Sequence, residues 1–143
     1  MAAEIEIVLA KAAHIRTIAK RMRKADRDEV LAASGKTPFE ALAYSLRKSS
    51  IAYTGLINGQ PEVMFGVGDI NILNAVGAPW LLGTDAVERN YLAFLRRSVV
   101  WKRFFLERYA VLRNLVDARN TVSIRWLRWL GFTFSEPVNL RGH

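Results

Sequence analysis

The chain has 143 residues, of which 51% are apolar and 24% are charged, and its formal net charge is +8. This length suits one domain with a substantial core, and the composition excludes a disordered polar chain. The lack of cysteine excludes disulfides and thiolate metal sites, and two histidines, His14 and His143, are too few for a zinc site. We therefore expect a single domain over residues 1–143 with no bound metal.

The sequence predicts neither a membrane span nor export through a signal peptide. No apolar run reaches the roughly 18–20 residues that cross a bilayer. Glu4 and Glu6 stand where a secretory signal would carry bases followed by an apolar stretch.

One strand and then helices are expected in the first third of the chain. The segment Glu4–Leu9 favours a short strand. Apolar residues then recur at the spacing of an amphipathic helix, which we expect to run to Gly35 with or without a break. Thr37 with Glu40 three residues later, and Pro38 between them, forms a capping box that opens a second helix, ending near Lys48.

Six bases lie on the polar side of the first helix without an acid among them. They are Lys11, Arg16, Lys20, Arg21, Arg23 and Lys24. This run is either a solvated helix face or a surface for an anionic partner such as nucleic acid, and charge alone does not decide between the two.

Three strands follow. Ile51–Ile57 and Glu62–Val67 are joined by Asn58 and Gly59, a strong hairpin signal. The glycines from Gly66 onward predict the end of the second of these strands or a bulge. Ala78–Leu82 predicts a central strand, with Pro79 at its start.

The last part of the chain alternates helices and strands. Asp85, with Glu88 three residues later, predicts the N-cap of the longest helix. Then come a strand over Val111–Asp117, a helix over Thr121–Leu130 and a strand from Phe132. The order β-α-α-β-β-β-α-β-α-β predicts an α/β (α+β) fold with a mixed sheet, because the helical crossovers require parallel neighbours.

This order, together with the segment Asn120-Thr-Val-Ser-Ile-Arg-Trp-Leu-Arg-Trp-Leu-Gly-Phe132, resembles the Gcn5-related N-acetyltransferase (GNAT) superfamily. In that superfamily an asparagine opens a helix that ends in Leu-Gly-Phe. Three further phrases resemble the internal virion protein A-like group of T7-like phages and prophages: Met64-Phe-Gly-Val, Pro79-Trp-Leu-Leu-Gly-Thr-Asp and Val116-Asp-Ala-Arg-Asn-Thr-Val-Ser-Ile-Arg-Trp-Leu. The resemblance implies a GNAT fold, other virion proteins as partners, and a place in the phage virion or host cytoplasm.

The resemblance also locates a cofactor site. Active members hold the acetyl-CoA pyrophosphate on Arg/Gln-x-x-Gly-x-Gly/Ala, whereas this chain reads Gly-Thr-Asp-Ala-Val-Glu-Arg from residue 83. Only one glycine is present, and two acids place negative charge where phosphates would bind. No cofactor is therefore expected. If acetyl-CoA does bind, the positions implied to hold it are Leu82, Gly83, Thr84, Asp85 and Asn120.

Catalytic residues are not assigned. The family's proton-donating tyrosine, seven residues after the asparagine, is replaced by Leu127, and Tyr109 is a weak substitute. Among candidate bases, Glu62 and Asp69 are expected to be solvated carboxylates. Asp117 is expected to pair or cap locally, and His14 to lie at a helix start.

The predicted final helix carries two tryptophans, each directly after an arginine. We expect Trp126 to pack on the sheet, whereas Arg125, Arg128 and Trp129 form a candidate partner-binding surface.

Three functions follow from these patterns. The first is a virion-associated structural or assembly protein with a degenerate acetyl-CoA site and no efficient catalysis. The second is a divergent acetyl-CoA-dependent N-acetyltransferase. The third is a nucleic-acid-binding module that uses the bases between Lys11 and Lys24.

Overall fold

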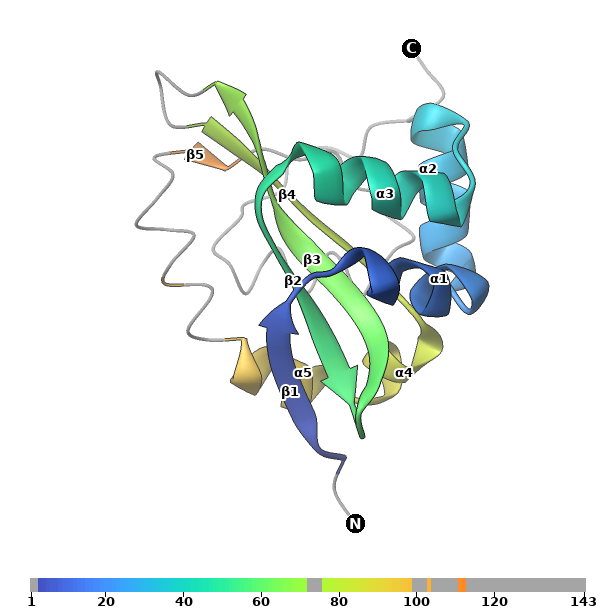
Figure 1. Ribbon diagram of the computed structural model, residues 1–143, viewed down its shortest axis with the longest axis vertical. Helices are drawn as coiled ribbons and strands as arrows, with labels where there is room; N and C mark the ends of the chain where they lie inside the picture. Colours follow the sequence, from blue (N-terminus) through green and yellow to red (C-terminus); the bar gives the residue numbers. More distant parts are fainter. Residues whose placement is uncertain (1–2, 72–75, 99–102, 104–110, 113–143) are drawn as a thin grey trace.

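The computed structural model describes residues 3–71, 76–98, 103 and 111–112 of the chain. Its strands form one mixed sheet in the order β1-β2-β3-β4-β5, antiparallel from β1 to β4 and parallel between β4 and β5 (Figure 1). The predicted mixed sheet is confirmed. The strands are β1 (Ile5–Leu9), β2 (Ser49–Ile57), β3 (Gln60–Asn71), β4 (Val76–Gly83) and β5 (Val111–Leu112). The helices are α1 (Ala12–Lys20), α2 (Lys24–Ser34), α3 (Pro38–Lys48), α4 (Asp85–Arg89) and α5 (Tyr91–Arg97).

Helices cover both faces of the sheet. In Figure 1, α1 and α3 cross in front of the strands, whereas α4 and α5 lie behind them. β3 contributes side chains to both helix–sheet interfaces, because consecutive side chains of a strand point to opposite faces. Met64 packs with α1 and α3, and Phe65 packs edge-on against Phe94 of α5, with 5.4 Å between ring centres. The front core comprises Ile15, Ile18, Met22, Ala41, Leu42, Met64 and Leu82.

The β2–β3 hairpin forms as predicted. Asn58 and Gly59 have φ values of 52° and 82°, the positive values that a primed two-residue turn requires. The Asn58 side chain also accepts a hydrogen bond from the Glu4 backbone N–H at 3.0 Å. This contact holds the start of β1 beside the turn.

The helices before β2 are three rather than two. The predicted first helix breaks between α1 and α2, and α2 ends at Gly35, whose φ of 70° confirms the predicted stop. The capping box at the start of α3 is also confirmed. Thr37 Oγ1 accepts the Glu40 N–H at 3.2 Å, and Glu40 Oε1 accepts the Thr37 N–H at 2.9 Å.

The glycines from Gly66 onward do not end the strand, because β3 continues to Asn71. The other alternative, a bulge, agrees with the register shift between Asp69 and Asn71 in the pairing with β4. Gly66 itself serves a close approach, since a Cβ there would lie 2.4 Å from the Ile51 carbonyl oxygen. Pro79 is the fourth residue of β4, opposite Val67, and not its first. Proline is tolerated inside a strand where its nitrogen is not needed as a ladder donor.

The predicted long helix after β4 is also corrected. It divides at Asn90 into the five-residue α4 and the seven-residue α5. The elements predicted beyond Leu112 lie outside the described residues. Among the helices that the structure describes, none is long and apolar enough to span a bilayer.

Candidate functional site

The turn that joins β4 to α4 contains four of the predicted cofactor positions. Leu82 belongs to the front core, and Thr84 is only 2% exposed. The N-cap of α4 is Thr84 and not Asp85 as predicted, because Thr84 Oγ1 accepts the Ala86 N–H at 3.2 Å. Asp85 is exposed and is the first helical residue, where a carboxylate is favoured by the helix dipole.

Three backbone N–H groups of this turn are bound inside the protein. The Gly83 N–H donates to Asp26 Oδ2 at 2.9 Å, and the Thr84 N–H donates to the Glu62 carbonyl at 2.8 Å. The Ala86 N–H donates to the Thr84 hydroxyl. These donors, which would face the ligand in an anion cradle, therefore have acceptors within the chain.

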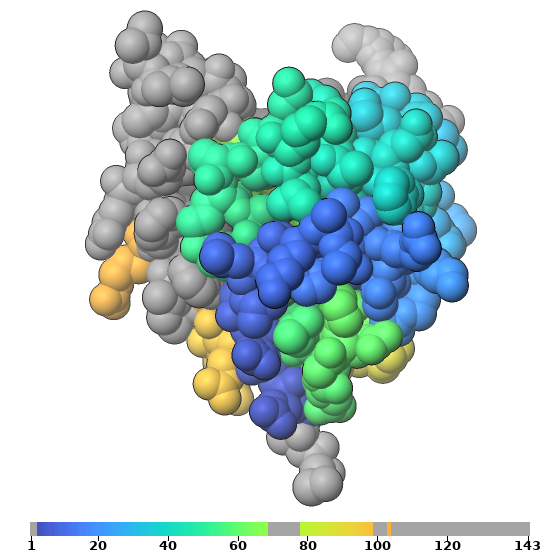
Figure 2. Space-filling model, viewed as in Figure 1, coloured from blue at the N-terminus to red at the C-terminus, as the bar shows by residue number. Residues whose placement is uncertain are grey.

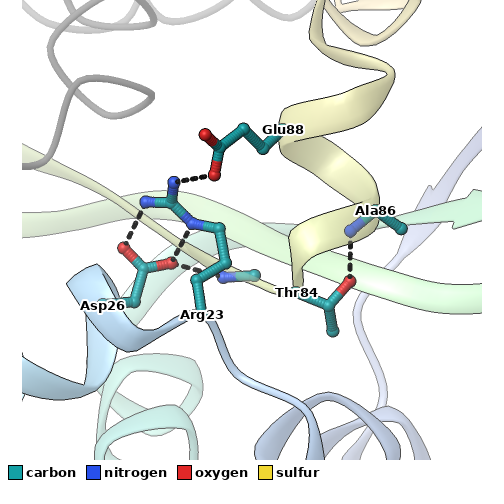
Figure 3. Close-up of polar contacts among 6 residues, drawn as sticks. Arg23, Asp26, Thr84, Ala86 and Glu88 are labelled. Carbon is teal, nitrogen blue, oxygen red and sulfur yellow. Dashed lines mark hydrogen bonds and ion pairs between the residues drawn. The ribbon is translucent and has the colours of Figure 1, made fainter.

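Asp26 forms a buried ion pair with Arg23 beside the turn (Figure 3). Asp26 is fully buried and Arg23 is 3% exposed. Arg23 Nη2 donates to Asp26 Oδ1 at 2.9 Å, and Nε donates to Oδ2 at 3.3 Å. The Arg23 backbone N–H also donates to the Gly83 carbonyl at 2.8 Å. Arg23 and Asp26 thus bind both backbone polar groups of Gly83.

A second carboxylate contacts the same guanidinium from the solvent side. Glu88 Oε2 lies 3.4 Å from Arg23 Nη1, and the Glu88 side chain is 56% exposed. Burial alone would lower the pKa of Arg23, but the hydrogen bond and charge of Asp26, with those of Glu88, raise it above its ordinary value. Arg23 therefore stays charged, and its charge is neutralised within the protein.

Glu62 is buried, which contradicts the prediction of a solvated carboxylate. Its Oε1 accepts hydrogen bonds from Thr84 Oγ1 at 2.8 Å and from Arg21 Nη2 at 2.6 Å. A single bridge between Met22 and Thr84 brings the α1–α2 connection to the β4–α4 turn, which is hydrogen-bonded to the backbone of Glu62 near the start of β3. This arrangement explains the placement of Glu62. The other candidate base, Asp69, lies in β3 opposite Gly77.

The basic run divides between solvent and ion pairs. Lys11, Arg16 and Lys20 are exposed on α1, as the solvated-face interpretation predicts. Arg21 and Lys24 are exposed as well, and they pair with Glu62 and Asp28. The solvated-face interpretation is wrong for Arg23, which is buried and pairs with Asp26.

His14 lies in the first turn of α1, as predicted. Its Nδ1 accepts the Lys11 N–H at 3.1 Å and lies 2.8 Å from Thr54 Oγ1. Burial, and then the charge of Lys11, lower the pKa of His14. These contacts describe a capping residue.

Arg23 and Asp26 were not predicted as site residues. Their i, i+3 spacing is a signal for an ion pair, but such pairs are common on exposed helices. What makes this pair part of the site is the bond to Gly83, which is 57 residues away from Asp26. No local pattern carries that information.

The other predicted site residues lie outside the part of the chain that the structure describes, and the proposals about them stay predictions. They are Tyr109, Asp117, Asn120, Arg125, Trp126, Leu127, Arg128 and Trp129. Within the described ranges, no group of three or more histidine, aspartate or glutamate side chains is placed to hold a metal ion.

No family model matches the sequence, and no curated protein matches it. Solved acetyltransferase structures do match the fold. An acetyltransferase of the GNAT family from Streptococcus pneumoniae has a TM-score of 0.58 and 17% identity, with 92% of this chain and 86% of that chain covered.

Two further similar structures were solved with coenzyme A. The aminoglycoside acetyltransferase AAC(6')-Ib has a TM-score of 0.58 and 12% identity, over 92% of this chain and 86% of that chain. The aminoglycoside N-acetyltransferase AAC(6')-Iy has a TM-score of 0.50 and 12% identity, over 96% and 93%. At these identities the likeness concerns the fold. The chain therefore has the mixed α/β fold of the GNAT acetyltransferases.

Proposed function

We propose that this chain is a phage or prophage protein that uses the GNAT fold in a structural or assembly role in the virion, without efficient acetyl transfer. The role is supported by the sequence resemblance around Pro79–Asp85. The loss of activity is supported by the buried contact between the Asp26 carboxylate and the Gly83 N–H. That contact is the observation that carries the proposal.

A diphosphate at this turn would need the N–H group that Asp26 already binds. Asp26 would have to leave both Gly83 and Arg23, and breaking a buried ion pair costs about 3–5 kcal/mol. Such a cost weakens binding by about two to three orders of magnitude. The carboxylates of Asp85 and Glu88, which flank the turn, would in addition repel the phosphate oxygens.

Isothermal titration of the whole chain with acetyl-CoA tests the loss of cofactor binding. The aminoglycoside acetyltransferase AAC(6')-Ib, solved with coenzyme A, serves as the positive control. We expect no binding at micromolar concentrations. Micromolar affinity with a stoichiometry of one would overturn this part of the proposal.

The assembly role is tested separately on purified particles. Virions from phage-producing cells are separated on a density gradient, and the chain is quantified in each fraction by mass spectrometry. We expect it to sediment with the particles at a fixed ratio to the capsid protein. A chain that stays in the soluble fraction contradicts the assembly role without affecting the result on acetyl-CoA.

A second candidate is a divergent acetyl-CoA-dependent N-acetyltransferase. The fold likeness to enzymes solved with coenzyme A favours it. Here the backbone of Leu82 to Asp85, with Asn120, would contact the cofactor. Coenzyme A release with a panel of amines tests this candidate. It predicts turnover that Asn120→Ala abolishes and that Lys24→Gln, at an exposed position, retains.

A further inference from the structure

The outer surface of α3 carries an aromatic ring surrounded by cations. Tyr44 is 43% exposed. Lys36 Nζ lies 4.6 Å from the centre of its ring, Arg47 Cζ 5.7 Å and Lys48 Nζ 6.0 Å. Arg47 and Lys48 are three and four residues after Tyr44 and therefore share its helix face. We call these four residues the Tyr44 cluster.

The cations of the Tyr44 cluster have no carboxylate partner in the described part of the chain. The ion pairs found there involve Arg21, Arg23 and Lys24, and none involves Lys36, Arg47 or Lys48. Glu40, the acid on the same face of α3, binds the Thr37 N–H in the capping box. The cluster thus has three cations against one nearby carboxylate, and Arg47 and Lys48 are exposed to solvent.

The cluster lies in a basic segment of the chain. Residues 11–48 contain ten lysines and arginines against four acids, a net charge of +6. These residues form α1, α2 and α3, and α1 and α3 pack together over the front of the sheet (Figure 2). A concentration of one charge sign raises the local concentration of oppositely charged partners.

We infer that the Tyr44 cluster binds single-stranded nucleic acid. A base stacks on the Tyr44 ring, and adjacent phosphates contact Lys36, Arg47 and Lys48. Aromatic rings among cations suit single strands, whose bases are free to stack. A duplex keeps its bases stacked internally, and an acidic peptide has no base to place on the ring. The inference is independent of the proposed function, because it involves no residue of the β4–α4 turn.

This surface differs from the basic run that the sequence singled out. Arg21, Arg23 and Lys24 of that run are bound in ion pairs. The exposed bases at and just before α1, Lys11 and Arg16 among them, add to the positive charge of the same helical layer, but within the described residues no aromatic ring contacts them. The stacking centre is therefore on α3.

Fluorescence anisotropy with a labelled oligothymidylate, measured over a range of NaCl concentrations, tests the inference. Three phosphate contacts predict that log K falls with log salt with a slope of about −2. Tyr44→Ala should weaken binding about 5-fold or more, because a stacking contact is lost, and should leave the slope unchanged. Tyr44→Phe keeps the ring and should keep the affinity.

The cations are tested by charge removal with a matched control. Arg47→Gln and Lys48→Gln should each reduce the magnitude of the slope by about 0.7. Lys24→Gln removes the same charge from an exposed ion pair with Asp28 and should leave the slope unchanged. Circular dichroism verifies the fold of each variant.

Two competitors decide between classes of partner. Oligoglutamate and a DNA duplex of equal charge should compete poorly with the oligothymidylate. If either binds as tightly and is unaffected by Tyr44→Ala, the cluster is a general anion surface or an acidic-protein site, and the inference is overturned. It is also overturned if Tyr44→Ala binds the single strand like the unchanged chain.

Discussion

The β4–α4 turn and the Tyr44 cluster both contain cationic side chains, and these side chains differ in burial. At the turn, Arg23 is buried and contacts two carboxylates, Asp26 and Glu88. At the cluster, Arg47 and Lys48 are exposed and have no ion-pair partner among the described residues. A buried charge must be neutralised within the fold, because its desolvation is costly, whereas an exposed charge is stabilised by water.

This difference in burial distinguishes the β4–α4 turn, which the family resemblance implies as a cofactor site, from the exposed Tyr44 cluster. At the implied site, the N–H groups of Gly83, Thr84 and Ala86 donate to acceptors within the chain. The Tyr44 cluster was not implied by any motif, and its residues Tyr44, Arg47 and Lys48 are exposed. Measurements on single variants can contradict either statement.

The largest effect is expected from Asp26→Ala. It removes the closer of the two carboxylates that contact the buried Arg23 guanidinium, and it leaves the Gly83 N–H without its acceptor. We expect the free energy of unfolding to fall by about 3–5 kcal/mol, measured by urea denaturation. The control, Asp28→Ala, removes an exposed ion pair with Lys24 and should cost less than about 1 kcal/mol. Equal losses in the two variants would show that the buried pair does not hold the turn.

Thr84→Ala should have the second largest effect. It removes the cap of α4, worth about 1 kcal/mol, and one hydrogen bond to the buried Glu62 carboxylate, which brings the total to about 2–3 kcal/mol. Thr37→Ala is the matched control, since it removes only a cap on an exposed helix start. If both variants lose the same stability, the bond to Glu62 contributes nothing.

A smaller effect on stability is expected when a change of pH titrates His14. The burial of this side chain is intermediate between that of Arg23 and that of the Tyr44 cluster. The pKa of His14 is lowered in the folded state from the ordinary 6.5. As pH falls through this window, the unfolded chain takes up a proton before the folded chain does. Stability therefore falls as pH drops from above 6.5 to below the folded pKa. Thermal melts should show this fall, and His14→Gln should flatten it.

Tyr44→Ala should have the smallest effect on stability. The side chain is 43% exposed, so its removal should change the free energy of unfolding by no more than about 0.5 kcal/mol. Urea denaturation of this variant beside Asp26→Ala measures the contrast between the two regions. A loss comparable with that of Asp26→Ala would mean that the Tyr44 ring supports the core and does not form an open surface.

Much of the fold was predictable because its signals are local. The hairpin depends on two adjacent residues that tolerate positive φ, Asn58 and Gly59, and the start of α3 depends on a box that spans Thr37 to Glu40. The candidate turn after β4 was located by the family resemblance, and its local cap signal pointed to Asp85 in place of Thr84. Asn120, the remaining cofactor position, stays a prediction.

What the sequence by itself determined is therefore the order of the strands through β4, the β2–β3 turn, the stop of α2 and the start of α3, and the excess of positive charge. Only the tertiary structure decided which charged side chains are buried and paired and which are exposed to solvent. Asp26 and Gly83 are hydrogen-bonded although they are 57 residues apart. Glu62 accepts hydrogen bonds from Thr84 and Arg21, which belong to two other segments. The free energy of a charged group depends on the donors that surround it in space, and residues distant in sequence provide those donors.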